Sequence, residues 1–275
     1  MRYFDGYGVE IVRYFDATGG LAAVFIALIT FVYMLRSLKV IFHNDDFNQL
    51  QHHRAILISA LAVVILHYIL ALYSIYFNEP SDRDVDNFIW WANGYAMGER
   101  EYWLVVGAEL YKQFLSLFFY AFGSSSFLLS CVTIFVFTAS LVMFLKICVL
   151  LGIRTKGFLP IILFTAMPGF LVVTIEPYRE CFQIFFLMSA IYYGIKFRME
   201  MRFIDIVFSV VFLILFGLFH FGTMAMVPFI IYLLLLFPIV RKRPLFRFRN
   251  GLVFVNMKVF SMSIFIIVIL LILAV

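Results

Sequence analysis

The chain has few charged residues for its length of 275. Aspartate, glutamate, lysine and arginine together make up 13% of it, against about 25% in soluble proteins. Hydrophobic residues make up 65%, and the mean hydropathy is +1.04. This composition excludes an ordinary soluble domain and predicts an all-α protein that crosses a membrane several times.

Cysteine is also scarce. Cys131, Cys148 and Cys181 all lie within apolar runs, where they act as small hydrophobic residues without metal-ligand spacing. We therefore expect no disulfide framework, no metal site and no cofactor.

Asp5 and Glu10 near the N-terminus argue against a cleaved signal peptide. Internal repeats and a soluble domain are lacking too, so residues 1–275 are expected to form a single membrane domain.

Apolar runs long enough to cross a bilayer recur along the chain. A helix needs about 20 apolar residues to cross the hydrocarbon core. By this measure we predict about eight spans, at residues 18–36, 55–77, 125–146, 157–175, 180–196, 203–220, 223–240 and 256–275. The predicted fold is therefore a polytopic membrane helix bundle.

Lysine and arginine indicate the orientation of these spans. Four connections, at residues 36–54, 146–156, 196–202 and 241–258, hold 15 of the 21 basic residues. Because basic residues in short loops stay on the cytoplasmic side, we predict that these four connections are cytoplasmic and the others outside. The net charge of +5 then reflects membrane topology, and no nucleic-acid partner is expected.

The longest polar interval, residues 78–103, falls on the predicted outer side. It carries six acidic residues against two arginines, with aromatic residues between them. Carboxylates near lipid lose hydration, so such a cluster usually serves a ligand, an ion or a partner. We therefore expect functional chemistry in this outer loop. Its aromatic residues either stack on a ligand or form an interfacial belt; they include Trp90, Trp91, Tyr95 and Tyr102.

Residues 103–122 follow this interval and are long enough to span. A span here would turn the basic C-terminal connection outward, against the charge rule. Glu109, Lys112, Gln113 and Ser116 fall at i, i+3, i+4 and i+7, on one helical face. We therefore predict an amphipathic helix along the outer surface, with its polar stripe turned to the loop, within an outer region of residues 78–122. A spanning helix with a polar interior face is the alternative.

Five short motifs follow one another along the chain. An acidic segment runs from Asp84 to Phe88, a glutamate-led segment from Glu109 to Leu115, and Gly123 precedes the next span. Arg179-Glu180-Cys181-Phe182-Gln183 opens a span, and Phe219-His220-Phe221-Gly222 stands before a span that contains Pro228. This order resembles the Wzy/EpsG type of O-antigen or exopolysaccharide polymerase over roughly residues 20–240, and it is similar to the GT-C glycosyltransferases.

The chain departs from the family pattern at three places. Phe88 stands where tyrosine is usual, and Gly222 or Thr223 stands where serine is usual. Members of the family usually continue through further spans beyond the position of Val275. The resemblance therefore leaves open a complete enzyme, a chain truncated at its C-terminus or a shortened relative.

The resemblance implies a glycosyltransferase or polysaccharide polymerase of the bacterial cytoplasmic membrane. It would act at the outer face on sugars carried by polyprenyl diphosphate. Its partners would be that lipid-linked oligosaccharide, the bilayer and other polysaccharide-assembly proteins. Transfer requires a base for the acceptor hydroxyl and a cation for the departing diphosphate.

The expected base is Asp84, with Asp86 as its neighbour, or His220 at the end of a span. Arg179 is expected to bind the diphosphate, because a guanidinium binds two oxygens at once and lies here at a helix start. Alternatively, Arg179 marks topology and pairs with an acid. The predicted substrate-binding residues are Arg179, Glu180, Glu109, Asp82 and Arg83.

Two functions of other classes remain open. A transporter or flippase for lipid-linked saccharides would need polar groups near the middle of its spans. The spans here are almost uniformly apolar apart from His67 and scattered serines. A non-catalytic membrane scaffold would fit the short length of the chain.

Overall fold

Helices account for most of the protein. The computed structural model describes residues 2–4, 10–12, 16–42, 50–77, 83–102, 106–151, 158–200, 202–219, 222, 227, 230–231, 246–249 and 252–255. Strands in this part of the chain form two short antiparallel hairpins, β1 (Arg2–Phe4) with β2 (Glu10–Val12) and β3 (Phe246–Arg249) with β4 (Leu252–Val255).

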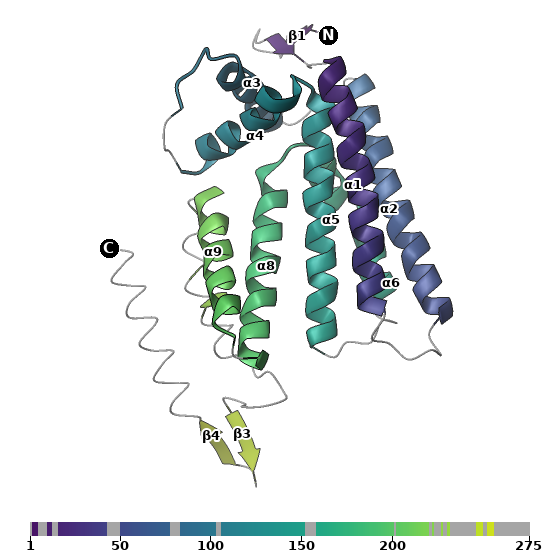
Figure 1. Ribbon diagram of the computed structural model, residues 1–275, viewed down its shortest axis with the longest axis vertical. Coiled ribbons are helices and arrows are strands. Elements are labelled where there is room, and N and C mark those ends of the chain that lie inside the picture. Colours follow the sequence, from purple (N-terminus) through teal and green to yellow (C-terminus); the bar gives the residue numbers. More distant parts are fainter. Residues whose placement is uncertain are drawn as a thin grey trace.

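Long helices lie side by side and form the body of the molecule (Figure 1). They are α1 (Ala17–Phe42), α2 (Leu50–Phe77), α5 (Ser126–Leu150), α8 (Arg179–Glu200) and α9 (Phe203–Phe219). The helices α1, α2 and α5 are long and apolar enough to cross a membrane. Large apolar side chains of α1, such as Leu21 and Phe25, are exposed, as lipid-facing side chains are. The fold is therefore that of a membrane helix bundle.

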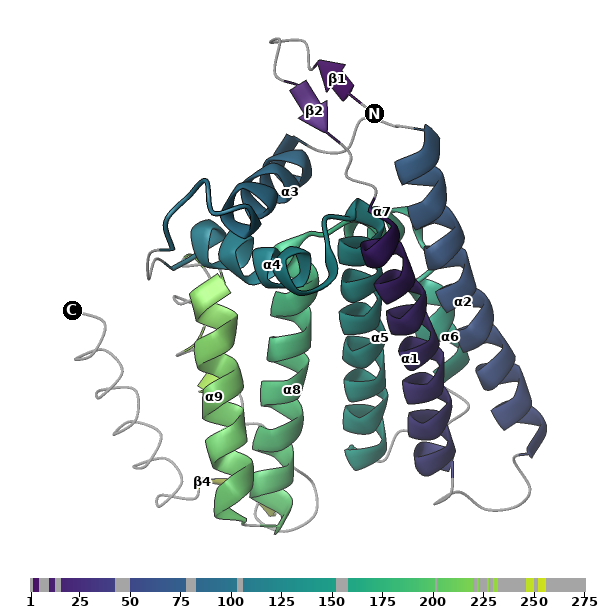
Figure 2. The same cartoon turned by 45° about the horizontal axis from the view of Figure 1, so that its top comes forward.

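Two further helices lie across one end of this bundle. They are α3 (Arg83–Ala96) and α4 (Ala108–Phe122), and we refer to them together as the cap. Figures 1 and 2 show the cap at the end where α1, α5 and α8 begin and where α2 and α9 finish. The alternating directions of the helices therefore bring chain segments from positions 16, 77, 125, 179 and 219 to this end.

Most of the predicted spans within the described residues correspond to single helices. The exception is the prediction for residues 157–175, which are divided into α6 (Phe158–Phe164) and α7 (Pro168–Ile175). Pro168 has no amide hydrogen and is favoured in the first turn of a helix, so it ends one helix and starts another. The predicted spans 223–240 and 256–275 lie outside the described residues, apart from helical positions 227, 230 and 231.

Most of the polar interval that was predicted to be a loop forms a helix, α3. Val85, Phe88, Ile89 and Ala92 are buried at i, i+3, i+4 and i+7, so α3 has an apolar face that packs inward. The helix expected from residue 103 begins instead at Ala108, after Gly107, whose φ is 82°. Glycine accepts this conformation at little cost, which lets the chain turn sharply into α4.

The cap is joined to the bundle at Gly123, the residue that ends α4. Its φ of 86° and ψ of 158° lie in a region that is almost restricted to glycine. A Cβ at this position would collide with the carboxylate of Asp16 and the hydroxyl of Thr18. These two residues form the start of α1, where the Thr18 hydroxyl donates to Asp16 Oδ2 at 2.6 Å. The end of α4 therefore lies directly against the beginning of α1.

We predict that Gly123→Ala lowers the free energy of unfolding by more than about 2 kcal/mol, because backbone strain and steric overlap add. Gly20→Ala is the matched control, since a Cβ there would meet no atom within 4 Å and alanine favours the helix by roughly 1 kcal/mol. The reaction of the buried cysteines Cys131, Cys148 and Cys181 with a thiol dye on heating reports unfolding. Equal transition temperatures for the two variants would contradict the close packing.

Candidate functional site

An aromatic cluster lies where the cap meets α8 and α9. The ring of Tyr111 from α4 is 5.2 Å from Phe88 of α3, 5.5 Å from Phe182 of α8 and 5.9 Å from Phe219 of α9, measured between centroids. All four side chains are buried. Tyr111 meets each of the other three rings edge to face, and Phe182 and Phe219 stack on each other; both are favoured aromatic geometries. The cluster thus fixes the positions of four helices relative to one another.

Two hydrogen bonds strengthen this junction. The Tyr111 hydroxyl donates to the carbonyl of Pro177 at 2.7 Å, just before α8. The amide of Gly107 donates to the carbonyl of Leu218 at 2.7 Å, at the end of α9. Burial raises the pKa of Tyr111 well above its usual value; nearby Cys181 and Glu180 add to this rise and Arg179 opposes it. The phenol is therefore neutral and donates its hydrogen bond at physiological pH.

Arg179 starts α8 beside this cluster. Its guanidinium carbon lies 5.9 Å from the centroid of the Phe88 ring, so the arginine reaches toward α3. Arg179 Nε lies 3.4 Å from Glu180 Oε1, and both side chains are partly exposed. Glu176 instead accepts a hydrogen bond from the buried Ser74 hydroxyl at 2.9 Å. Arg179 is therefore paired with its neighbour Glu180 and still has N–H donors near the surface of the cap.

The structure brings the predicted base region to the same place. Asp84 precedes Phe88 by four residues in α3, which is one helical turn. The structure describes the backbone at Arg83 and Asp84 but not their side chains, and Asp82 lies outside the described residues. Asp86 is partly exposed on α3. The roles predicted for these residues stay predictions.

His220 also lies outside the described residues, but its predecessor Phe219 is placed. Phe219 is the last residue of α9 and belongs to the aromatic cluster. The first three of the motifs quoted above reach the cap directly, through Phe88, the Glu109 segment and Gly123. The other two reach it through the start of α8 and the end of α9. Segments that are far apart in the sequence thus meet at one end of the bundle (Figure 2).

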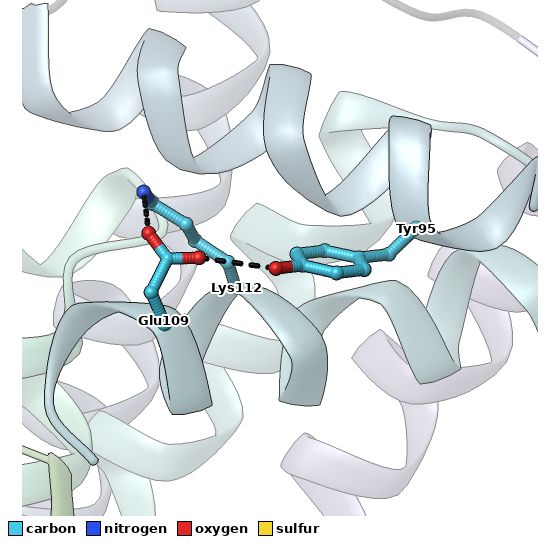
Figure 3. A network of polar contacts seen from close by, with 3 residues as sticks. All are labelled: Tyr95, Glu109 and Lys112. Carbon is cyan, nitrogen blue, oxygen red and sulfur yellow. Dashed lines mark hydrogen bonds and ion pairs between the residues drawn. The ribbon is translucent and has the colours of Figure 1, made fainter. Parts of the chain in front are cut away.

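A second group of polar contacts joins the two cap helices. Lys112 Nζ lies 2.5 Å from Glu109 Oε1, and the Tyr95 hydroxyl donates to Glu109 Oε2 at 3.1 Å (Figure 3). Burial raises the pKa of Tyr95, and the hydrogen bond to the Glu109 carboxylate adds to this effect. Glu109 and Lys112, predicted either to line a site or to pair with each other, are therefore paired.

The polar stripe of α4 faces α3 and the segment that follows it. The Tyr102 hydroxyl lies 3.0 Å from Ser116 Oγ. Trp91 has two cations against its ring: the guanidinium carbon of Arg100 at 3.2 Å and Lys112 Nζ at 4.5 Å from the centroid. The ring of Trp91 is therefore in contact with two cations of the protein itself. Arg100 has no role predicted from the sequence; the signal that points to it is a glycine, Gly94, in the interior of a helix next to two tryptophans.

No group of three or more metal-ligating side chains occurs in the parts of the chain that the structure describes. Comparison of the chain with protein-family models, with curated proteins and with solved structures finds no match. The functional interpretation therefore depends on the chemistry and the placement of these residues.

We predict that Glu109→Gln destabilises the protein more than Lys112→Met does. Glu109→Gln leaves the buried ammonium of Lys112 without its carboxylate, at a cost of about 1–3 kcal/mol. Lys112→Met removes the buried charge and keeps the apolar stem, while the carboxylate of Glu109 stays hydrated because its side chain is 33% exposed. Thermal unfolding of both variants in detergent measures the difference. A larger loss in Lys112→Met would show that the ion pair does not stabilise the cap in this way.

Proposed function

We propose that the protein is a membrane glycosyltransferase that polymerises or transfers sugars carried on polyprenyl diphosphate. It would act at the outer face of the bacterial cytoplasmic membrane, as O-antigen and exopolysaccharide polymerases do. The observation that carries this proposal is the meeting of the acidic α3 segment, Arg179 at the start of α8 and the end of α9 at one end of the bundle.

The proposed reaction is a displacement at the anomeric carbon of the lipid-linked sugar. The oxygen of an acceptor hydroxyl forms a bond to that carbon, and the bond from the carbon to the diphosphate oxygen breaks. The departing diphosphate takes the bonding electron pair, and the proton of the acceptor hydroxyl passes to a base. Asp84 is the first candidate for this base, followed by His220 and Asp86.

Arg179 has the chemistry to stabilise the leaving diphosphate. Its guanidinium carries a permanent positive charge and binds two phosphate oxygens side by side. The first turn of α8 adds backbone amide groups that have no partner within the helix, and these favour anions. Glu180 orients the guanidinium through the contact at Nε and leaves its remaining N–H groups for the ligand.

The proposed topology has about eight spans, with the cap outside. The described helices alternate in direction, so the basic residues near the ends of α1, α5 and α8 and near the starts of α2 and α9 lie at the end opposite the cap (Figure 1). This arrangement agrees with the preference of basic residues for the cytoplasmic side. Spans at residues 223–240 and 256–275 would complete the bundle.

A transporter for the same lipid-linked saccharide is a second candidate, and His67 favours it. This residue is fully buried within α2, and its Nδ1 lies 2.7 Å from the carbonyl of Val63; its Nε2 has no hydrogen-bond partner among the residues that the structure describes. Polar groups inside membrane spans often mark a transport path. Movement of the lipid-linked saccharide across proteoliposomes without formation of a glycosidic bond would identify this function.

We predict that Arg179→Ala lowers the rate of polymerisation by about 10²-fold or more, as the loss of a group that stabilises transition-state charge does. Arg179→Lys should retain part of the activity, because it keeps the charge but not the two-point contact. The assay measures the chain length of the product formed from a polyprenyl-diphosphate oligosaccharide.

Arg202→Ala serves as the control for this assay. Arg202 is 65% exposed and pairs with Glu200 at the other end of the bundle. The Arg179–Glu180 pair is partly exposed and its contact is long, at 3.4 Å, so the loss of the ion pair itself should cost little stability. Wild-type chain length in a stable Arg179→Ala protein would refute the proposed function.

A further inference from the structure

Arg100 occupies a corner between two tryptophan rings in the cap. Its guanidinium carbon lies 3.2 Å from the centroid of Trp91 and 4.5 Å from that of Trp90. The two indole rings are nearly perpendicular, with an angle of 85° between their planes. A cation held against aromatic faces in this way loses freedom of orientation, while a planar guanidinium carries its N–H groups at its edge and not on the face that a ring covers.

Gly94 provides the space for the arginine side chain. A Cβ at position 94 would lie 2.9 Å from Arg100 Nε and 3.2 Å from its Cδ. Gly94 lies within α3, where a glycine costs roughly 1 kcal/mol of helix stability relative to alanine. Packing therefore explains the glycine at this position: without a Cβ, it leaves room for the Arg100 side chain along the helix and against Trp91.

Arg100 forms no ion pair with the residues that the structure describes. Its guanidinium lies against the two tryptophan rings, and its side chain packs along Gly94. The other cation at Trp91, Lys112, is committed to Glu109. The neighbouring Glu99 and Glu101 are exposed, and neither forms an ion pair with Arg100. A guanidinium that is oriented, partly exposed and without an acidic partner among the described residues is suited to bind an anion in two-point geometry.

We propose that Arg100, held by Trp91 and Gly94, binds a phosphoryl group of a lipid at the cap. The inference rests on the proposed function for the identity of that lipid: the diphosphate of the polyprenyl-linked substrate. The phosphate of an anionic bilayer lipid has the same chemistry and is the other source. Glu99 and Glu101 repel an anion weakly because water screens exposed charges, so they lower the affinity without blocking the site.

The experiment measures binding by the tryptophan emission of the full chain in phosphatidylcholine nanodiscs. Farnesyl diphosphate, a short polyprenyl diphosphate, is the probe. We expect a saturable change in emission that Arg100→Gln weakens about tenfold or more, as the loss of a charge-assisted hydrogen-bond pair does. Gly94→Ala should also weaken binding, because the added Cβ displaces Arg100 although alanine favours the helix. Arg202→Gln is the matched control and should bind as the wild type does.

Wild-type affinity in Arg100→Gln would overturn the proposal, and wild-type affinity in Gly94→Ala would overturn the positioning role of the glycine. Circular dichroism confirms that each variant is folded. Discs that contain phosphatidylglycerol separate the two sources: if this lipid alone changes the emission and displaces the probe, the ligand is a bilayer headgroup. If the affinity for the probe is unchanged in these discs, the ligand is the diphosphate of the substrate.

The anion site and the proposed function can be refuted separately. A chain that binds the probe through Arg100 but transfers no sugar would refute the proposed function and leave the anion site in place. A chain in which Arg100→Gln transfers sugar and binds the probe as the wild type does would refute the anion site and leave the proposed function in place.

Discussion

The packing of α4 against α3 is the interaction on which the arrangement of the cap depends. Glu109, Lys112 and Ser116 lie on one face of α4, and a lipid environment would leave these groups without partners. In the structure they contact each other and the aromatic side chains of Tyr95, Trp91 and Tyr102. The opposite side of α4 buries Tyr111, Leu115 and Phe119 toward the bundle. A helix with these two faces is stable across the end of the bundle, where α3 covers its polar face and the bundle covers its apolar face.

This position of the cap also explains how the candidate site is assembled. Tyr111 connects α4 to the segment before α8, and Gly107 connects its start to the end of α9. The cap thereby holds the start of α8, with Arg179, next to Phe88 of α3. The cations in and beside the cap differ in their contacts: Lys112 is paired with Glu109, Arg179 makes a longer contact with Glu180, and Arg100 lies against tryptophan rings.

The sequence predicts the long helices well because each is a run of apolar residues with polar ends. It also predicts the location and the polar face of α4, since Glu109, Lys112 and Ser116 follow the helical period. It does not predict the break before Pro168, because the length of an apolar run says nothing about its continuity. The helix α3 was missed for the opposite reason: its charges suggested a loop, although Val85, Phe88, Ile89 and Ala92 follow the period of a buried face. Arg100 was missed because its partners are aromatic rings, and because the contact forms only when the chain folds back against α3.

The central claim is that the cap lies on the outer side of the membrane, opposite the end that carries Arg202. The most direct test replaces the three buried cysteines by alanine and introduces Glu101→Cys or Arg202→Cys, both at exposed positions. Intact cells are then treated with a maleimide that cannot cross the membrane. The account predicts that Glu101→Cys reacts in intact cells and that Arg202→Cys reacts only after the membrane is permeabilised. Reaction of both variants from the same side, or the reverse pattern, would contradict it.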